Sequence, residues 1–329
     1  MRLGHWIARV VGLLAVGWAT LGAPPARAVD TITIGLVGTA SATHWPIYAG
    51  LKQGYYDEAG IKLDMIFTPS SGALVQQLAA GSLDAALSTG ITDPIYAIDK
   101  GAPIAVVRLE VQSPPYALIA KPTIKSLKDL KDLKGKIIMI DGPKGITKIY
   151  VERMLAKNGV KPTDYDALFA GATAARFAAL QSGAIDATVL LPPFNFYAET
   201  AGFANLGLTI DYTPELPFSG AVVNTNWAAK NRALLDRLLA VHNKSMAWFL
   251  DTKNRDQAIT VMVEASKQKR DDIANAYDFL LQHKFFEASG KVSKTKMNAL
   301  LAALKELGDV SAGLTVEKLL MPGATQVTD

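Results

Sequence analysis

One short pattern of residues occurs twice in this chain, and the repeat constrains the fold more than any other feature. Four residues of the first copy recur in the second at an offset of 102 residues: Leu78, Gly81, Asp84 and Ala85, then Leu180, Gly183, Asp186 and Ala187. In each copy the leucine would pack a helix onto a sheet, and the glycine would adopt the left-handed conformation that ends a helix. Any βαβ unit needs such a helix and glycine stop. The loop lengths match as well as the residue types, which favours a duplicated unit over chance similarity.

Short apolar runs alternate with helical patterns in both halves of the chain. The first half predicts strands over 31–37, 61–67, 83–87 and 104–109, with helices over 44–58, 73–80 and 92–100 between them. The second half predicts strands over 136–140 and 166–169 around a helix over 146–158. Strands that alternate with helices predict mostly parallel sheets. We therefore expect an α/β protein with two similar lobes.

Two proline-containing segments predict the places where the chain crosses between the lobes. One lies near 111–116 and the other near 213–218. These crossings assign residues 29–112 and 220–329 to the first lobe and residues 113–219 to the second. Beyond Asn224, apolar stripes predict helices that pack on the outside of the lobes, mainly the first. Ligands bind at the carboxyl ends of the strands in open α/β sheets, so we expect a cleft between lobes that closes about the two crossings.

The first 28 residues have the pattern of a secretory signal peptide. An apolar run over 10–21 follows a basic start, and Ala26-Arg27-Ala28 is a small-x-small cleavage site. The run is shorter than the roughly 20 residues that span a bilayer, although an uncleaved anchor is the alternative. Cleavage after Ala28 leaves 301 residues and lowers the formal net charge from +4 to +1, because three arginines and no acidic residue leave. Nothing in this charge balance points to nucleic acid or to an anionic membrane surface as a partner.

The sequence contains no cysteine, which excludes disulfides, thiolate catalysis and cysteine-based zinc sites. It also lacks the G-x-S-x-G and HExxH motifs and any paired metal-ligand spacing. After cleavage only three histidines remain, and His242 and His283 fall in helical stretches far from the strand-end loops. We therefore expect a soluble protein of a Gram-negative periplasm, with no stable insertion in the membrane and with no catalytic residue, metal or cofactor.

Loops that follow the predicted strands supply the candidate ligand contacts of the first lobe. The loop before the helix at 44–58 ends at a helix start, where unpaired N–H groups and a partial positive charge suit an anion. The candidates from this and the next two loops are Thr39, Ser41, His44, Trp45, Ser70, Ser71, Thr89 and Asp93. Helix capping explains the serines almost as well, and core burial explains Trp45 equally well. Asp93 would attract a cationic or amino-bearing ligand and repel an anion, unless it is an ordinary first-turn acid.

The second lobe offers a matching loop over 141–147, without the GxxxxGK[ST] spacing of a nucleotide-binding loop. Lys144 and Thr147 would bind a carboxylate, sulfonate or phosphate there, although a solvated lysine is the alternative. Arg176 would either fork onto a planar anion or pair with a surface acid. The remaining candidates are Pro193 and Phe194, as an apolar wall, and Ser219, where the chain returns from the second crossing.

Four stretches, in their order and spacing, resemble a known family. They read IGLVGTASATHWPIYAGLKQGYYDEAGIKLDMIF, SSGALVQQLAAGSLDAAL, SPPYALIAKPTIKSLKDLKDLKGKII and ARFAALQSGAIDATVLLPP. The chain resembles the periplasmic substrate-binding proteins of the nitrate/sulfonate/taurine group of ABC importers, whose domain is shared with thiamine-pyrimidine synthases. The resemblance covers nearly the whole mature chain. It implies a type II two-lobe binding-protein fold, a monomer without catalytic activity, and a membrane permease with its ATPase as partners.

The resemblance leaves the ligand open, because family members bind anions, sulfonates, pyrimidines and aromatic compounds. The paired helix starts, Trp45, Lys144 and Arg176 favour a small planar or anionic organic solute. Two alternatives remain. One is a periplasmic enzyme on the same scaffold, although the synthase relatives carry a cysteine-rich motif that this chain lacks. The other is a sensing receptor that docks on a signalling protein.

Overall fold

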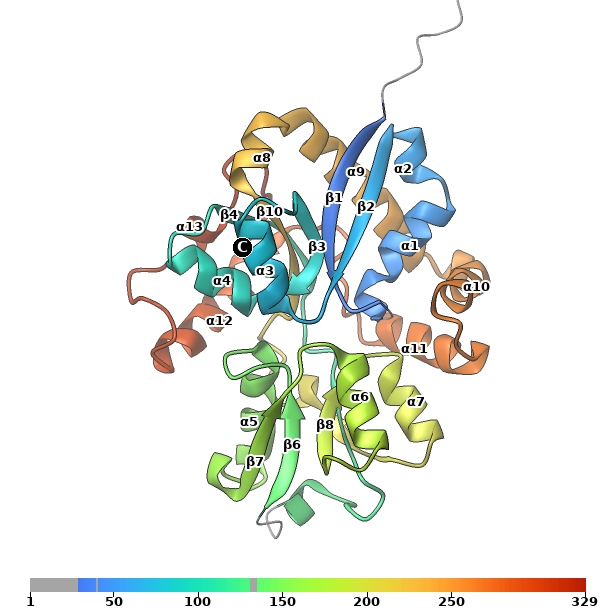
Figure 1. Ribbon diagram of the computed structural model, residues 1–329, viewed down its shortest axis with the longest axis vertical. Helices are drawn as coiled ribbons and strands as arrows, with labels where there is room; N and C mark the ends of the chain where they lie inside the picture. Colours follow the sequence, from blue (N-terminus) through green and yellow to red (C-terminus); the bar gives the residue numbers. More distant parts are fainter. Residues whose placement is uncertain (1–28, 40, 131–134) are drawn as a thin grey trace, which may run out of the picture.

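The computed structural model describes residues 29–39, 41–130 and 135–329, so the predicted signal peptide and its cleavage site lie outside the described residues. Two five-stranded sheets organise these residues into two lobes, drawn one above the other in Figure 1. The type II two-lobe α/β architecture predicted from the sequence is confirmed.

The sheet of the first lobe has the strand order β2-β1-β3-β10-β4. Its strands are β1 (Asp30–Val37), β2 (Ile61–Thr68), β3 (Ala85–Gly90), β4 (Ile104–Val111) and β10 (Ser219–Asn224). β1 pairs in parallel with β2 and β3, whereas β10 runs antiparallel to both of its neighbours. Every residue of β4 and β10 is buried, including the charged Arg108 and Glu110 of β4.

The sheet of the second lobe repeats this plan in the order β7-β6-β8-β5-β9. Its strands are β5 (Ala117–Ala120), β6 (Lys136–Ile140), β7 (Tyr165–Phe169), β8 (Ala187–Leu190) and β9 (Ala204–Leu208). β5 is the antiparallel strand here, and it takes the same fourth position that β10 takes in the first sheet. In each sheet the antiparallel strand is therefore the segment that has just crossed from the other lobe.

The repeated aspartate has the same task in both copies. Asp84 accepts a hydrogen bond from the backbone N–H of Thr33 at 2.8 Å, and Asp186 accepts one from Ile137 at 2.9 Å. Each carboxylate thus ties the start of one strand, β3 or β8, to the neighbouring strand. The repeated glycines behave as predicted, because Gly81 and Gly183 have φ angles of 79° and 77°.

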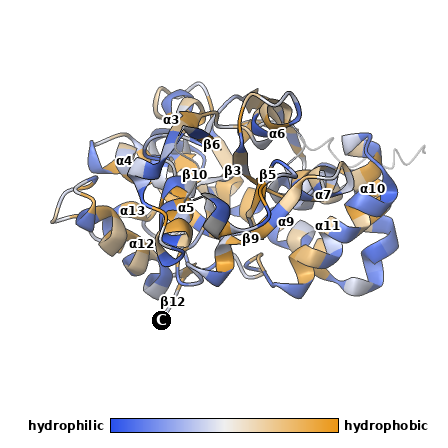
Figure 2. Ribbon diagram, turned by 90° about the horizontal axis from the view of Figure 1, so that it is seen from below, coloured by the Kyte–Doolittle hydropathy of each residue, from blue (hydrophilic) through white to orange (hydrophobic). Residues whose placement is uncertain are grey.

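Helices cover both faces of each sheet. Those between the strands are α1 (Trp45–Lys52), α2 (Tyr55–Glu58), α3 (Ser71–Ala79), α4 (Thr92–Asp99), α5 (Ile146–Lys157), α6 (Thr173–Gln181) and α7 (Phe194–Thr200). The prediction of a single helix over residues 44–58 is wrong. Gly54 has a φ of 73° and breaks that stretch into α1 and α2. The central strands are mostly hydrophobic and outer helices such as α4 and α10 carry hydrophilic stretches (Figure 2).

The C-terminal part is helical, as expected. It contains α8 (Thr225–Lys230), α9 (Arg232–Leu250), α10 (Arg255–Ser266), α11 (Arg270–Gln282), α12 (Lys294–Glu306) and α13 (Val316–Leu319), with a short ladder of β11 (Val292–Ser293) and β12 (Val327–Thr328). Most of these helices pack on the first lobe, for example α9 and α10 on α1. α11 also contacts α7 of the second lobe, where the rings of Phe196 and Phe279 lie 5.6 Å apart.

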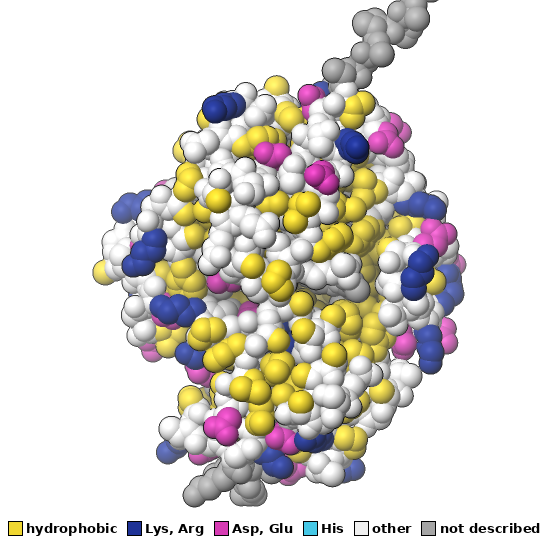
Figure 3. Space-filling view, in the orientation of Figure 1, with side chains coloured by type: hydrophobic (Ala, Val, Ile, Leu, Met, Phe, Trp, Pro, Cys, Tyr) yellow, Lys and Arg dark blue, Asp and Glu magenta, His cyan; other side chains and the backbone are white. Residues whose placement is uncertain are grey.

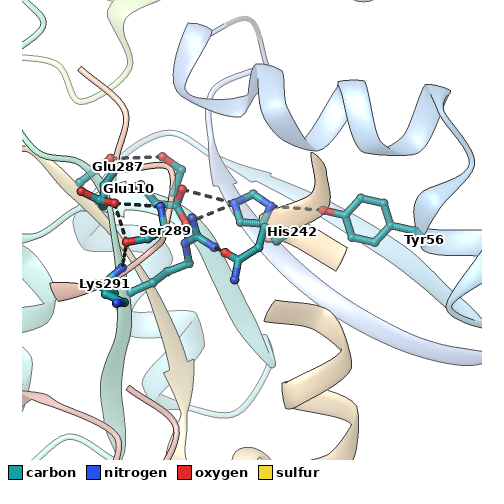
Figure 4. A network of polar contacts seen from close by, with 10 residues as sticks. Tyr56, Glu110, His242, Glu287, Ser289 and Lys291 are labelled. Atoms are coloured by element: carbon teal, nitrogen blue, oxygen red, sulfur yellow. Dashed lines mark hydrogen bonds and ion pairs between the residues drawn. The ribbon is translucent and has the colours of Figure 1, made fainter. Parts of the chain in front are cut away.

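A buried polar network lies behind the first sheet, on the side of α9 (Figure 4). The Nε of Arg108 lies 2.6 Å from a carboxylate oxygen of Glu110, and both side chains are only 2% exposed. His242 contacts Glu110 with one ring nitrogen and the hydroxyl of Tyr56 with the other, at 3.3 Å each. The asparagine next to it, Asn243, accepts a hydrogen bond from Arg108. His242, which the sequence placed in a helical stretch far from the strand-end loops, is thus part of a buried ionic cluster.

The chain crosses between the lobes twice, close to the predicted places. β4 ends at Val111 and β5 begins at Ala117, whereas the return runs from the end of β9 to Ser219. The two crossings lie side by side, because the N–H of Phe218 donates to Val111 and the N–H of Thr209 donates to Tyr116, both at 2.9 Å. We propose that the domain boundaries lie at residues 112–113 and 219–220. Among the helices of the described residues, none is both long enough and apolar enough to cross a bilayer.

Candidate ligand-binding site

A cavity of about 370 Å³ lies between the two lobes and is lined by loops from both sheets. Its size falls in the range of small-molecule sites, roughly 300–1,000 Å³. The first lobe contributes the segments that follow β1, β2 and β3, and the second contributes those that follow β6, β7 and β8. Parallel strands bring their carboxyl ends to one edge of a sheet, so each lobe presents three such loops to the cavity.

The lobes touch each other around this cavity. The N–H of Ala42 in the first lobe donates to the carbonyl of Pro192 in the second at 3.1 Å. Gly171 approaches Ser70 so closely that a Cβ on the glycine would lie 2.4 Å from the serine Cβ. Figure 3 shows the lobes in contact across the middle of the molecule, with hydrophobic side chains on both sides of the boundary. The structure is therefore a closed arrangement.

Ten of the fourteen candidate residues line the cavity. They are Thr39, Ser41, His44, Ser70, Ser71, Thr89, Asp93, Lys144, Phe194 and Ser219. The structure brings these residues together from loops up to 180 positions apart in the sequence. Their contact with a ligand stays a prediction.

The loop after β1 places His44 against the cavity. Ser41 caps the short turn at 42–44, because its hydroxyl accepts from the N–H of Thr43 and lies 2.9 Å from the hydroxyl of Thr43. Within this turn His44 is 1% exposed, and its Nδ1 has no hydrogen-bond partner among the described residues. Burial lowers the pKa of His44 to about 4, so the ring is neutral at pH 7.

The hydroxyls of the next two loops form a connected set. Ser70 caps α3 by accepting from the N–H of Ala73 at 3.1 Å, as the capping alternative predicted. Thr89 donates to Ser71, whose own hydroxyl proton can go either to the carbonyl of Gly90 or to the carboxylate of Asp93. These contacts fix the hydroxyl positions at the wall of the cavity, and Ser71 and Thr89 keep acceptor capacity for a bound molecule.

Two carboxylates line the cavity from opposite sides, Asp93 on α4 and Asp141 after β6. Burial raises the pKa of Asp93, a hydrogen bond from Ser71 partly offsets this, and the charge of Asp141 adds to the increase. Burial also raises the pKa of Asp141. The charge of Arg176 and hydrogen bonds from Thr147 partly offset this increase. Both acids thus lie partly buried at the same cavity.

Lys144 lies at the rim of the cavity and pairs with the first lobe. Its ammonium group lies 2.8 Å from a carboxylate oxygen of Asp309, which follows α12, and 5.6 Å from the ring centre of Tyr96. Lys144, which the sequence suggested as a contact for an anionic ligand, thus already forms an ion pair with an acid of the protein.

Arg176 and Thr147 do not line the cavity, because their polar atoms are used within the second lobe. The fully buried guanidinium of Arg176 donates to the carbonyls of Val189, Ala170 and Gly171 and to the hydroxyl of Thr173. Thr147 is fully buried and donates to Asp141. Both residues hold the strand-end loops in place rather than facing the site.

Trp45 and Pro193 also lie outside the cavity lining. Trp45 is 1% exposed and packs its ring edge-on against Phe249 of α9, with centroids 6.3 Å apart. Pro193 directly precedes α7 as its N-cap residue. The sequence left open whether Trp45 belongs to the core or to the site. It belongs to the core, because the long helix α9 covers its ring.

Two aromatic residues of the crossings line the cavity and were missed. Tyr116 precedes β5 and Phe218 precedes β10, and their rings meet edge-to-face at 5.1 Å. The proline-containing segments were interpreted only as linkers. The available signal was an aromatic residue at the end of each segment. Asp141 also lines the cavity, although the sequence pointed only to Lys144 and Thr147 in its loop.

The described residues offer no metal centre: no group of three or more His, Asp and Glu side chains lies close enough to hold an ion within residues 29–39, 41–130 and 135–329.

We expect Trp45→Phe to reduce stability without changing ligand affinity. The smaller ring leaves unfilled volume against Phe249, which costs roughly 1–2 kcal/mol of the free energy of unfolding. Urea denaturation measures the loss, and calorimetric titration with a ligand measures affinity. A tenfold weaker affinity in this variant would mean that Trp45 acts on the ligand after all.

The geometry defines a class of protein. Two α/β lobes joined by two crossings around a cavity form the type II fold of periplasmic binding proteins. Within this class, the family model described as NMT1/THI5 like matches residues 41–255, and the chain belongs to that family.

Several known proteins are similar to parts of the chain. A 4-amino-5-hydroxymethyl-2-methylpyrimidine phosphate synthase of Saccharomyces cerevisiae is 26% identical over 160 residues, which cover 49% of this chain and 46% of the yeast protein. The putative aliphatic sulfonates-binding protein of Escherichia coli is 26% identical over 206 residues, or 62% of each chain. The chain thus spans about half the length of the first curated relatives it matches.

Among solved structures, the alkanesulfonate-binding protein of Xanthomonas axonopodis pv. citri, bound to MOPS, superposes with a TM-score of 0.72. The match covers 92% of this chain and 100% of that one at 16% identity, so it concerns the fold.

Proposed function

We propose that this protein is a periplasmic solute receptor of an ABC importer, which closes its two lobes around a small planar organic molecule and delivers it to a membrane permease. The observation that carries the proposal is the cavity of about 370 Å³ between lobes that touch through Ala42 and Pro192. A ligand that contacts both lobes favours the closed form by differential binding. The permease then recognises the closed outline of a monomer.

The comparisons support a receptor more than an enzyme. The E. coli relative is named as a binding protein and matches a larger share of its own length than the yeast synthase does, 62% against 46%. The family resemblance implies a cysteine-rich motif in the synthases, and this chain has no cysteine. We therefore propose that the cavity binds and releases its ligand unchanged.

A thermal-shift screen of sulfonates, aromatic carboxylates, nitrate, pyrimidines and amines tests this function. We expect at least one compound to stabilise the protein, because a ligand at 100 times its Kd adds about 2.7 kcal/mol to the free energy of unfolding. Small-angle scattering should show that the same compound reduces the radius of gyration. Conversion of the bound compound into a product would favour an enzyme, and binding only to sugars or peptides would contradict the proposed ligand class.

A further inference from the structure

The charged groups of the cavity do not balance in favour of an anion. Its described lining contains two carboxylates, Asp93 and Asp141, and one basic side chain with a permanent charge, Lys144. The ammonium group of that lysine is paired with Asp309 at 2.8 Å. The buried Arg176 lies behind the wall and donates only to protein oxygens. An anion entering this space would meet two acids, whereas Arg176, the cation behind the wall, has its N–H groups occupied by protein oxygens.

Asp93 is the less compensated of the two acids. Asp141 is held by Thr147 and lies within the field of Arg176. No described lysine, arginine or histidine forms an ion pair with Asp93, and the groups that act on it are the hydroxyl of Ser71 and the charge of Asp141. A half-buried carboxylate without a counter-ion is costly in an empty protein. A positively charged ligand would remove that cost.

His44 supplies a further polar group at the wall of the cavity, without a hydrogen-bond partner in the part of the chain that the structure describes. Its side chain is 1% exposed, lines the cavity, and has an Nδ1 atom without a partner among the described residues. The Nδ1 of a neutral imidazole accepts a hydrogen bond when the proton sits on Nε2 and donates one when the proton sits on Nδ1. With the proton on Nε2, an N–H group of a bound molecule would satisfy Nδ1.

The apolar part of the cavity suits a flat cation. Tyr116 and Phe218 from the crossings and Phe194 from α7 line the cavity. Aromatic faces carry negative partial charge and attract cations placed over them. The guanidinium of Arg176 already lies 5.9 Å from the ring centre of Tyr116, which leaves Phe218 and Phe194 for a cationic ligand. Carboxylates and aromatic faces around one space favour the same sign of ligand charge.

We propose that the cavity selects a planar cation with N–H donors, such as an amidinium or a protonated amino-heteroaromatic ring, and that Asp93 is the residue that pairs with its charge. This inference rests on the proposed receptor function and specifies its ligand class. It assigns Asp141 and His44 as the neighbouring acceptors on the two lobes.

Four compounds with one ring and different charge test the proposal: benzamidine as the cation, benzamide as the neutral isostere, and benzoate and benzenesulfonate as the anions. Calorimetric titration of the purified protein at pH 7.5 and moderate salt should give a Kd for benzamidine on the order of 100-fold lower than for either anion, because like charges placed together cost several kcal/mol. Benzamide should fall between them.

Asp93→Asn should weaken benzamidine binding on the order of 30-fold and change benzamide binding less than about threefold. The melting temperature of the free variant should equal or exceed that of the wild type, since the substitution removes a half-buried charge without a counter-ion. The matched control is Asp64→Asn, an exposed acid on β2, which changes the net charge equally and should leave all four Kd values unchanged.

The outcomes separate the two levels of the proposal. Tighter binding of benzoate or benzenesulfonate than of benzamidine would overturn the cation selectivity and leave the receptor function standing. An unchanged benzamidine Kd in folded Asp93→Asn would remove Asp93 as the pairing residue. If no compound of either sign binds, here or in the wider screen, both the ligand class and the receptor function are contradicted.

Discussion

Gly171→Val should weaken ligand binding on the order of 100-fold while both lobes stay folded. A Cβ at this position would lie 2.4 Å from the Cβ of Ser70, 2.7 Å from its Cα and 2.8 Å from the carbonyl oxygen of Pro69. Two of these three atoms are backbone, so no side-chain rotation relieves the overlap. Ser70 and Pro69 belong to the first lobe and Gly171 to the second. The valine therefore obstructs closure and costs nothing inside either lobe.

Backbone strain at position 171 does not affect the interpretation of this experiment. Its φ angle lies outside the left-handed region that strains other residues, and its carbonyl still accepts from Arg176 in the variant. Calorimetric titration gives the affinity, and small-angle scattering shows whether ligand still reduces the radius of gyration. Gly313→Val is the matched control, because a Cβ there meets nothing within 4 Å. Full affinity and full compaction in Gly171→Val would mean that the bound state is more open than this structure.

Glu110→Gln should lower the free energy of unfolding by about 3–5 kcal/mol, the usual cost of removing one partner of a buried ion pair. The variant keeps the size of the side chain but leaves the guanidinium of Arg108, 2% exposed, without its counter-charge. His242 loses the same carboxylate. Urea denaturation measures the change. A loss below about 1 kcal/mol would mean that water or local rearrangement compensates the arginine.

Two controls separate charge from packing. The double variant Arg108→Met, Glu110→Leu replaces both charges by apolar groups of similar size and should recover most of the loss. Glu264→Gln breaks an exposed pair with Lys52, whose side chains are 56% and 53% exposed, and should change stability by less than about 1 kcal/mol.

The difference between wild type and Glu110→Gln should shrink at low pH. Burial alone would raise the pKa of Glu110, but the charge of Arg108 and the contacts with His242 outweigh it and hold the pKa below its ordinary value. A carboxyl with a lowered pKa in the folded state contributes stability above its unfolded pKa and loses it as the pH falls through the folded pKa. Urea denaturation across the acidic range tests this order.

The fold was predictable because local signals and tertiary structure agree in most elements. Gly81 and Gly183 end their helices in both copies, and strand boundaries such as those of β6 were predicted from the apolar run alone. The helix over 44–58 failed because its apolar spacing of four continues through Gly54, and the pattern hid the break. The antiparallel strand in each sheet was not foreseen either, since direction depends on how the chain returns from the other lobe.

The site was predictable only as far as loop position determines it. Residues at or just after the end of a strand, such as Thr89 and Thr39, lie at the cavity because the parallel strands end there. The surroundings of residues within the helices, such as Trp45 and Arg176, depend on what covers them. α9 covers Trp45, and backbone carbonyls surround Arg176. Neither neighbour is close in sequence, so no local pattern could have separated core from site.

Tyr116 and Phe218 are walls of the cavity and also the last residues of the two crossings before β5 and β10. A bound molecule would therefore contact the crossings between the lobes. A narrow ligand would allow the lobes to close fully, whereas a broad ring between these two aromatic side chains would bind well but keep the lobes partly open. Such a compound would act as an antagonist of uptake, with tight binding and no delivery. Affinity and transport should then rank a series of ligands differently.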